Sequence, residues 1–431
     1  MNIPVRLKRR RFILTVVVIA VMLAAAIYTT ILITRPPSNK PANLGAHVSG
    51  SKPVGISYGD TLVGDSASVL SQTLNDAVAI GATTIRLDLD WNDIQHNSSK
   101  TYYWTNFDRV VQAARAKNLS LLPMLAYTPA WARPSGCTTF TCAPANPNAF
   151  ASFAATAAGR YAPMGIHTWE IWNEPNDANF WRPTANVAQY VGLLQATSKA
   201  IKAVDPHAVI VSGGLAPTAT SGGNIAQLDF FSQFANSGGI SVVDAIGYHP
   251  YSYPVPPGYN ASWNAWQQIA NTSPSFESIL VAHGAANKQI WLTEYGAPTN
   301  GPGAAAIPTN YNLAQHPDHV DESLQAQMAS DAISLAQSSN YIGALYWYSY
   351  KDLGTSKSDR ENFFGLRRFD GTPKPAWKSF VQAINASKIR HLKFQHFDTM
   401  FPSIKQEAVY RDNVIGLSID GKPHRGPDDA H

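Results

Sequence analysis

The segment Trp169-Glu170-Ile171-Trp172-Asn173-Glu174-Pro175-Asn176 is a short apolar run that ends in two polar residues, Asn173 and Glu174. Short runs rich in aromatic and aliphatic residues are typical of strands that are buried on both faces of a parallel sheet. The segment therefore predicts such a strand, with polar side chains at the point where the strand leaves the core.

Seven further runs of the same kind lie before and after this segment, and longer amphipathic stretches separate them. The eight expected strands are Val54–Ser57, Thr84–Leu89, Leu119–Ala126, His167–Asn173, Val209–Gly213, Ala245–His249, Gln289–Glu294 and Ala344–Ser349. Expected helices include Ala67–Ile80, Phe107–Lys117, Ala149–Tyr161, Val187–Val204 and Ser323–Ser338. Eight strand-then-helix units over residues 53–386 predict an α/β protein, a (β/α)8 TIM barrel with extended loops.

A doubly wound open sheet is the competing architecture for alternating strands and helices. It predicts a glycine-rich phosphate turn after the first strand, but Gly55-Ile56-Ser57-Tyr58-Gly59 lacks the G-x-G-x-x-G spacing. The barrel is therefore favoured, and its chemistry is expected at the carboxyl ends of the strands.

A second glutamate ends the seventh expected strand, which reads Ile290-Trp291-Leu292-Thr293-Glu294-Tyr295. Two carboxyl groups that converge on one cleft can hydrolyse a glycosidic bond, if one is protonated and the other ionised. The alternative is that each glutamate caps a helix or pairs with an arginine. The contexts of Glu174 and Glu294 favour the paired catalytic role.

Trp172-Asn173-Glu174-Pro175-Asn176, followed 120 residues later by Thr293-Glu294-Tyr295, resembles clan A of the glycoside hydrolases. Family 39 is the nearer match in this clan, and family 5 is the second. The Asn-Glu-Pro motif is highly specific, and the resemblance covers residues 53–386. It implies a retaining β-glycosidase with Glu174 as the acid/base and Glu294 as the nucleophile.

The resemblance implies binding roles for five further residues. Asn173 would bond the 2-hydroxyl of the substrate, and Arg86 would keep the nucleophile ionised, unless it instead pairs with Asp88. His249 and Tyr251 resemble the clan's His-x-Tyr, which bonds the nucleophile or the sugar; the alternative for either residue is a plain part of the cleft wall. Trp347 resembles the aromatic platform beneath the sugar, although a buried barrel tryptophan is the alternative.

Aromatic residues make up 11% of the chain, and several fall in the expected loops. Aromatic rings stack on the apolar faces of sugars, so Trp131 is a further candidate for substrate binding. We expect no metal and no cofactor. The chain has no H-E-x-x-H, G-x-S-x-G or Walker lysine motif. Asp88 and Asp90 could suggest a metal site, since both point to one side of a strand, but the retaining mechanism requires no metal.

The first 35 residues hold six Lys or Arg residues and no acidic residue, so their charge of +6 exceeds the formal charge of +4 of the whole chain. The rest of the chain carries about −2, so we expect no nucleic-acid partner. The 23 uncharged residues Phe12–Thr34 are long enough to cross a bilayer, with the basic cluster on the cytoplasmic side. Residues 1–35 thus predict a transmembrane signal-anchor helix; a cleaved signal peptide, which would give a secreted protein, is the alternative.

Either reading places the catalytic domain outside the cytoplasm, where Cys137 and Cys142 can form a disulfide. Residues 36–52 are expected to be a stiff, proline-rich linker. Residues 387–431 are expected to be an extension of unassigned role, and a mobile tail and a short strand-forming appendage around residues 408–419 are its two alternatives.

The sequence therefore predicts a monomeric, membrane-anchored retaining β-glycoside hydrolase that acts on an extracytoplasmic poly- or oligosaccharide. Two other functions remain open on the same barrel. One is a transglycosylase, and the other is a carbohydrate-binding protein without activity.

Overall fold

The structure is a computed structural model that describes residues 52–400, with side chains through Ile389. The expected anchor Phe12–Thr34, most of the linker and the chain beyond residue 400 lie outside the described residues. Within residues 52–400, every helix is either too short or too polar to cross a bilayer.

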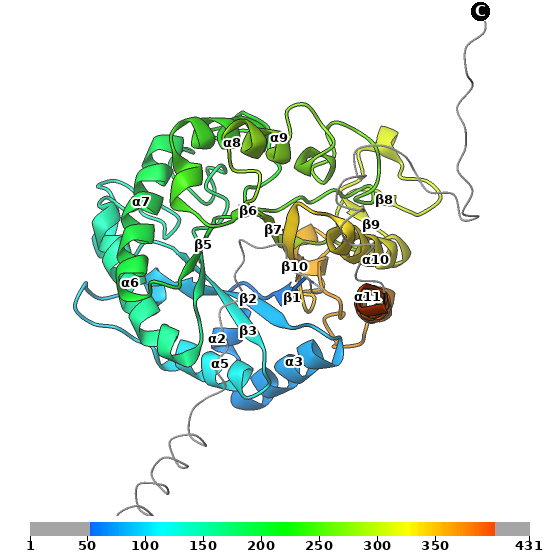
Figure 1. The fold of residues 1–431 in the computed structure, drawn as a ribbon, viewed down its shortest axis with the longest axis horizontal. Helices are drawn as coiled ribbons and strands as arrows, with labels where there is room; N and C mark the ends of the chain where they lie inside the picture. Colours follow the sequence, from blue (N-terminus) through cyan, green and yellow to red (C-terminus); the bar gives the residue numbers. More distant parts are fainter. Residues whose placement is uncertain (1–51, 401–431) are drawn as a thin grey trace, which may run out of the picture. The chain divides into compact units, whose positions relative to one another are not determined.

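Eight parallel strands form the centre of the molecule (Figure 1). They are β1 (Val54–Ser57), β2 (Thr84–Asp90), β3 (Ser120–Ala126), β4 (Thr168–Ile171), β5 (Val209–Ser212), β6 (Ile246–Tyr248), β7 (Ile290–Tyr295) and β10 (Ile342–Tyr348). The strand order is β5-β4-β3-β2-β1-β10-β7-β6, and parallel bridges between Val211 and Ala245 and between Leu215 and Tyr248 join the two edge strands. The sheet is thus a closed barrel, as the sequence predicted.

Helices surround the strands in Figure 1. The main ones are α3 (Ala67–Ala79), α5 (Thr105–Arg115), α6 (Pro147–Tyr161), α7 (Val187–Val204), α8 (Gln227–Asn236), α9 (Phe276–Ala282), α10 (Glu322–Ser338) and α11 (Pro375–Met400). Local capping sets several of their starts. The Asn186 side chain accepts from the backbone of Gln189 at the start of α7, and Asp321 accepts from Leu324 at the start of α10.

Shorter elements lie in the connections between the strands and the main helices. They are α2 (Thr61–Gly64), α4 (Trp91–Ile94), the small parallel pair β8 (Ala305–Ala306) and β9 (His319–Val320), and six 3₁₀ turns. The 3₁₀ turns are η1 (Ala130–Ala132), η2 (Ala162–Met164), η3 (Gly239–Val242), η4 (Gln267–Ile269), η5 (Leu313–Gln315) and η6 (Arg360–Phe363).

Helix α11 crosses position 386, at which the sequence analysis placed the end of the barrel domain. Phe380 of this helix packs against Trp347 of β10, and Ala376 and Ile384 are also buried. The last helix of the barrel therefore continues into the segment that was expected to be a separate extension.

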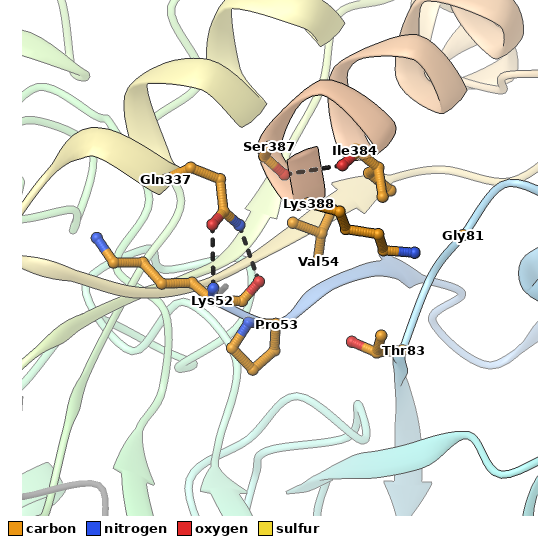
Figure 2. Close-up of a pocket in the computed structure, with 9 residues that line it drawn as sticks. All are labelled: Lys52, Pro53, Val54, Gly81, Thr83, Gln337, Ile384, Ser387 and Lys388. Atoms are coloured by element: carbon orange, nitrogen blue, oxygen red, sulfur yellow. Dashed lines mark hydrogen bonds between the residues drawn. The ribbon is translucent and has the colours of Figure 1, made fainter. Parts of the chain in front are cut away.

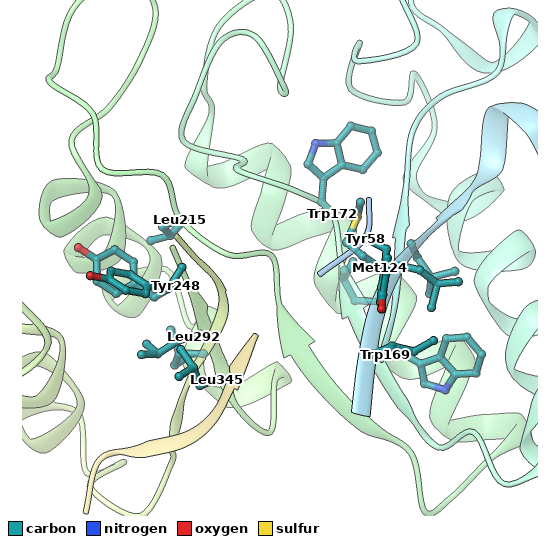
Figure 3. Packing of buried hydrophobic residues seen from close by; sticks show 14 of the residues in the cluster. Tyr58, Met124, Trp169, Trp172, Leu215, Tyr248, Leu292 and Leu345 are labelled. Carbon is teal, nitrogen blue, oxygen red and sulfur yellow. The ribbon is translucent and has the colours of Figure 1, made fainter. Parts of the chain in front are cut away.

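The core has two layers, which follow from the alternation of side chains along each strand. Six side chains cluster inside the barrel, namely Leu122, Val211, Ala245, Trp291, Ala344 and Tyr346. A larger layer lies between strands and helices and includes Trp169, Trp172 and Tyr248, which Figure 3 shows among their neighbours.

A cavity of about 80 Å³ lies beside the start of β1 (Figure 2). The backbone of Lys52 bonds the side chain of Gln337, and the Lys52 ammonium donates to the carbonyls of Ala336 and Ser339 at the end of α10. Burial lowers the pKa of Lys52 to about 8. These contacts fix the first described residue to the amino-terminal end of the strands, the end of the barrel away from the expected site.

Candidate active site

The carboxyl ends of β2, β4, β6 and β7 bring the main predicted site residues together. Arg86 lies on β2, Asn173 and Glu174 follow β4, His249 follows β6, and Glu294 lies on β7. Hydrogen bonds join Arg86 to Asn173 and Glu294, and His249 to Glu174. An ion-pair contact of 3.7 Å between His249 Nδ1 and Glu294 Oε2 connects the two groups into one network.

The guanidinium of Arg86 lies at the centre of this network and is 1% exposed. It donates to Glu294 Oε1 at 2.6 Å, Asn173 Oδ1 at 2.9 Å, Glu170 Oε2 at 2.5 Å and Ser57 Oγ at 3.2 Å. No hydrogen bond or ion pair joins Arg86 to Asp88 within the described part of the chain. The structure thus favours the nucleophile contact over the Arg86–Asp88 pair.

Glu294 is held in its ionised form by its neighbours. Burial alone would raise its pKa, but His249, Arg86 and a hydrogen bond from the Tyr251 hydroxyl outweigh burial and lower the pKa. The Tyr251 oxygen lies 2.7 Å from Glu294 Oε2. A carboxylate with a lowered pKa is suited to nucleophilic attack.

Glu174 has the opposite electrostatic setting. Burial is the largest cause and raises its pKa, and the charge on Glu294 adds to this, while His249 opposes it. His249 Nδ1 lies 2.8 Å from Glu174 Oε1, and His249 Nε2 lies 3.0 Å from Thr293 Oγ1. A buried carboxyl group with a raised pKa is suited to donate a proton.

The backbone around Glu174 is strained. Trp172 and Glu174 have φ angles of 72° and 45°, a region that residues other than glycine rarely adopt. The Trp172 ring is fixed by a hydrogen bond to the Phe180 carbonyl and by edge contacts with Tyr127 and Trp181. Surrounding packing therefore holds the conformation that directs Glu174 into the site.

Glu174 and Glu294 are close neighbours. One ligand atom from each of Glu174, His249 and Glu294 lies within 4.8 Å of the other two. The same three groups are the set nearest to a metal-binding geometry among the described residues, but each is already engaged in the hydrogen bonds above. The expectation that the protein uses no metal stays a prediction.

A register irregularity on β7 turns its end toward the site. Leu345 of β10 faces Leu292, whereas Trp347 faces Tyr295, so β7 has one extra residue between these pairs. An extra residue bends a strand and redirects side chains. Thr293 and Glu294 consequently both reach the network, although they are adjacent in sequence.

The prediction that Trp347 forms the sugar platform is wrong. Its side chain is fully buried and packs against Tyr295 and Phe380, in the layer between strands and helices. Because side chains alternate along a strand, the neighbour Tyr348 takes the cleft side. The charge on Glu294 adds to burial in raising the pKa of Tyr348, and Tyr348 packs on Phe364.

Trp131 is 37% exposed and lies in η1 after β3. Its indole nitrogen donates to the Gln95 carbonyl, and its ring meets Trp91 edge-on. Its role in substrate binding stays a prediction. Cys137 and Cys142, in the same loop, form a disulfide with their Cα atoms 6.1 Å apart.

The sequence analysis missed Glu170 and Thr293. Glu170 is fully buried and bonds Arg86 and the backbone of Gly214. A charged residue inside an apolar strand was a usable signal, because a buried charge needs a partner. Thr293 carried no such signal, because a threonine in a strand needs no charged partner and its contact with His249 joins two different strands.

Comparison with known proteins now adds to this geometry. Residues 49–350, more than half of the chain, match the family model described as cellulase (glycosyl hydrolase family 5). The chain belongs to glycosyl hydrolase family 5. The resemblance to clan A is thereby confirmed, and the matching model is that of the family that the sequence analysis placed second.

This family 5 member is also similar to proteins of other descriptions. A β-xylosidase of Geobacillus stearothermophilus is 25% identical over 262 residues, which are 59% of this chain and 45% of the xylosidase. The chain thus spans less than half of that relative's length. A family 39 glycoside hydrolase of Bacteroides cellulosilyticus WH2 has a TM-score of 0.57 at 21% identity, covering 79% of this chain and 65% of the other.

A GH5_18 protein of Streptomyces cattleya, solved in complex with GlcNAc, has a TM-score of 0.56 at 16% identity. The match covers 78% of this family 5 chain and 80% of that one. These structural matches establish the shared barrel.

Proposed function

We propose that this protein is a retaining β-glycoside hydrolase, with Glu174 as acid/base and Glu294 as nucleophile. The observation that carries the proposal is the pair itself. One carboxyl oxygen of Glu174 lies within 4.8 Å of one of Glu294, and Glu174 has a raised and Glu294 a lowered pKa. Retaining enzymes hold this pair about 5–5.5 Å apart, whereas inverting enzymes need roughly 6.5–9.5 Å.

In the first step, the Glu294 carboxylate attacks the anomeric carbon while Glu174 gives its proton to the leaving oxygen. The glycosidic C–O bond breaks, and an ester bond between the sugar and Glu294 forms. Tyr251 and Arg86 stabilise the Glu294 carboxylate until the attack. In the second step, water attacks the same carbon and gives a proton to the Glu174 carboxylate. The ester bond to Glu294 breaks, and the free sugar and the Glu294 carboxylate are released.

Asn173 is placed to bind the sugar during both steps. Its Oδ1 accepts from Arg86, so its amide nitrogen remains available as a donor. A donor beside the nucleophile suits the 2-hydroxyl, whose hydrogen bond strengthens in the transition state.

The proposal is tested with activated aryl β-glycosides, followed by polysaccharides. We expect turnover with net retention, seen by NMR as initial release of the β-anomer. Glu294→Ala should abolish turnover, and Glu174→Ala should be restored by azide on substrates with a good leaving group. Glu277→Ala, outside the site, is the matched control. Inversion, or turnover by Glu294→Ala, would exclude the proposal.

The proposed site cleaves the glycosidic bond, but the molecule that accepts the glycosyl group from Glu294 has to be determined separately. A transglycosylase passes the glycosyl group from Glu294 to another sugar instead of water. Product analysis with added acceptor sugars separates hydrolysis, which we propose, from transfer. A carbohydrate-binding protein without activity would give no product in either case.

We further propose that residues 1–35 hold the enzyme at the membrane as a monomer, with the barrel outside the cytoplasm. The uncharged run Phe12–Thr34 and the preceding basic cluster support this arrangement. The intact chain should remain in the membrane fraction after a high-salt wash, with its barrel open to added protease in spheroplasts. Recovery of a shortened chain in the medium would instead support a cleaved signal peptide.

A further inference from the structure

Two polar side chains beside the catalytic pair have no assigned role and no partner. Arg86, Asp88 and Asp90 alternate along β2, so all three share one face of the strand. Asp88 lies two residues, about 7 Å, beyond Arg86 toward the mouth of the barrel. Asp90 caps α4 through the backbone of Asn92, but the Asp88 carboxyl makes no hydrogen bond or ion pair within the described residues.

Tyr127, directly after β3, is the second unpartnered group. Its ring packs edge-on against Phe140 and Trp172 and is 7% exposed, yet no hydrogen bond to its hydroxyl is found in residues 52–400. The charges that act most strongly on this hydroxyl are those of Asp88, Arg86 and others at the catalytic end of β2. Tyr127 directly follows Ala126, the β3 residue that pairs with Asp90, so it leaves the sheet at the same end of the barrel as the Asp88 carboxyl.

The charges around Asp88 keep it protonated near neutral pH. Burial raises its pKa to about 8, Glu294, Asp60 and Asp90 act in the same direction, and Arg86 opposes them. The remaining titratable neighbours are the phenols of Tyr127 and Tyr348, whose own pKa values burial and nearby charges raise. A protonated carboxyl group both donates and accepts a hydrogen bond.

We propose that Asp88 and Tyr127 bind hydroxyl groups of the sugar that occupies the catalytic centre, on the side away from the 2-hydroxyl. This inference rests on the proposed function and names the part of the same site that selects the sugar. Polar groups at a cleft that have no protein partner are free to bond a ligand, so two of them beside the catalytic pair indicate a ligand that bonds both. A neighbouring pair of sugar hydroxyls offers a matching set of donors and acceptors.

The experiment compares a turned-over aryl β-glycoside with its 3-deoxy and 4-deoxy analogues. We expect wild-type kcat/KM to fall about 10- to 100-fold on one analogue, because a polar group of the site then loses its hydrogen bond to the sugar. Asp88→Ala and Tyr127→Phe should lose activity on the parent glycoside and largely lose this discrimination. Asp88→Asn should recover part of the activity, since an amide also donates and accepts.

The pH dependence separates this role from a structural one. Wild-type discrimination should weaken above about pH 8, where Asp88 ionises and can no longer donate, and it should stay constant in Asp88→Asn. Asp93→Asn, an exposed acid in α4, is the matched control and should behave as wild type.

Equal discrimination in wild type, Asp88→Ala and Tyr127→Phe would overturn the inference while leaving the hydrolase intact. An Asp88→Asn variant as inactive as Asp88→Ala would also overturn the inference. Activity would then require the negative charge of Asp88, for example to pair with a cation, and not its ability to donate and accept a hydrogen bond. If Asp88→Ala does not fold by thermal melting, Tyr127→Phe gives the answer. Failure of the wild type to cleave any glycoside would instead overturn the proposed function.

Discussion

Glu174 and Glu294 are the same residue type in one cleft, and their neighbours separate their chemistry. Glu294 receives hydrogen bonds from Arg86 and Tyr251, whereas Glu174 has His249 as its one side-chain partner in the described structure. Two carboxyl groups with pKa values moved in opposite directions are what acid/base and nucleophile roles require.

Tyr251→Phe tests this separation at a single atom. Removing the hydroxyl takes away one cause of the lowered Glu294 pKa, so the acidic limb of the kcat/KM profile should move to higher pH. Hydrogen bonds to charged groups are worth about 1.5–3 kcal/mol, so activity should fall roughly 10- to 150-fold.

The matched control for this variant is Tyr253→Phe. Tyr253 lies in the same loop and packs on Tyr251, but its hydroxyl makes no contact with Glu294 in the described chain. An unmoved acidic limb in Tyr251→Phe would show that this hydroxyl does not hold Glu294 ionised.

Among the elements, the turn after β5 is fitted closely to the site. The Gly214 amide donates to Glu170 and its carbonyl accepts from the Glu174 amide. A Cβ at this position would overlap the His249 ring and lie 2.6 Å from Thr293 Oγ1.

Gly214→Ala should therefore displace His249 and reduce kcat about 100-fold, the effect of roughly a 1 Å displacement in an active site. Steady-state kinetics on the best aryl glycoside give the measurement. Gly192→Ala on α7, where a Cβ meets open space, should leave kcat unchanged and is the control. Wild-type kcat in Gly214→Ala would contradict the close fit.

The loop after β10 carries Phe364 against Tyr251 and Tyr348, and a buried ion pair holds this loop. The Lys374 ammonium bonds Asp352 at 2.7 Å, Thr299 and the Phe363 carbonyl, and both charged groups are at most 5% exposed. Burial raises the pKa of Asp352 and lowers that of Lys374, so each depends on the other to stay charged.

Lys374→Met should lower the free energy of unfolding by about 3–5 kcal/mol, because it leaves Asp352 as an unpaired buried charge. Urea denaturation gives the value. The exposed pair Lys202–Asp244 provides the control, since Lys202→Met should cost at most about 1 kcal/mol. Equal losses in the two variants would contradict a structural role for the buried pair.

At the scale of the whole molecule, strand alternation and the residues that end the strands were enough to predict the barrel and most of the polar residues that meet at the carboxyl ends of its strands. Trp347 was assigned to the wrong side of β10, because successive side chains of a strand point to opposite faces. A match to the family motif that is shifted by one residue therefore selects the residue on the other face. The continuation of α11 past residue 386 was missed because the domain boundary was placed where the resemblance to the clan ends.

Contacts between distant strands account for the rest. That Arg86 bonds Glu170, and leaves Asp88 without a partner, follows from barrel closure across β2, β4 and β7. Local sequence patterns report which face of a strand a residue occupies, but they do not report which residue on another strand it meets.

The central claim is that Glu294 forms the covalent glycosyl intermediate. The most direct measurement is mass spectrometry of the protein after incubation with a 2-deoxy-2-fluoro analogue of its best aryl glycoside, which slows release of the sugar. We predict one added glycosyl group per chain, located on the peptide that contains Glu294 and absent in Glu294→Ala. Turnover without any adduct, or an adduct on another residue, would contradict the account.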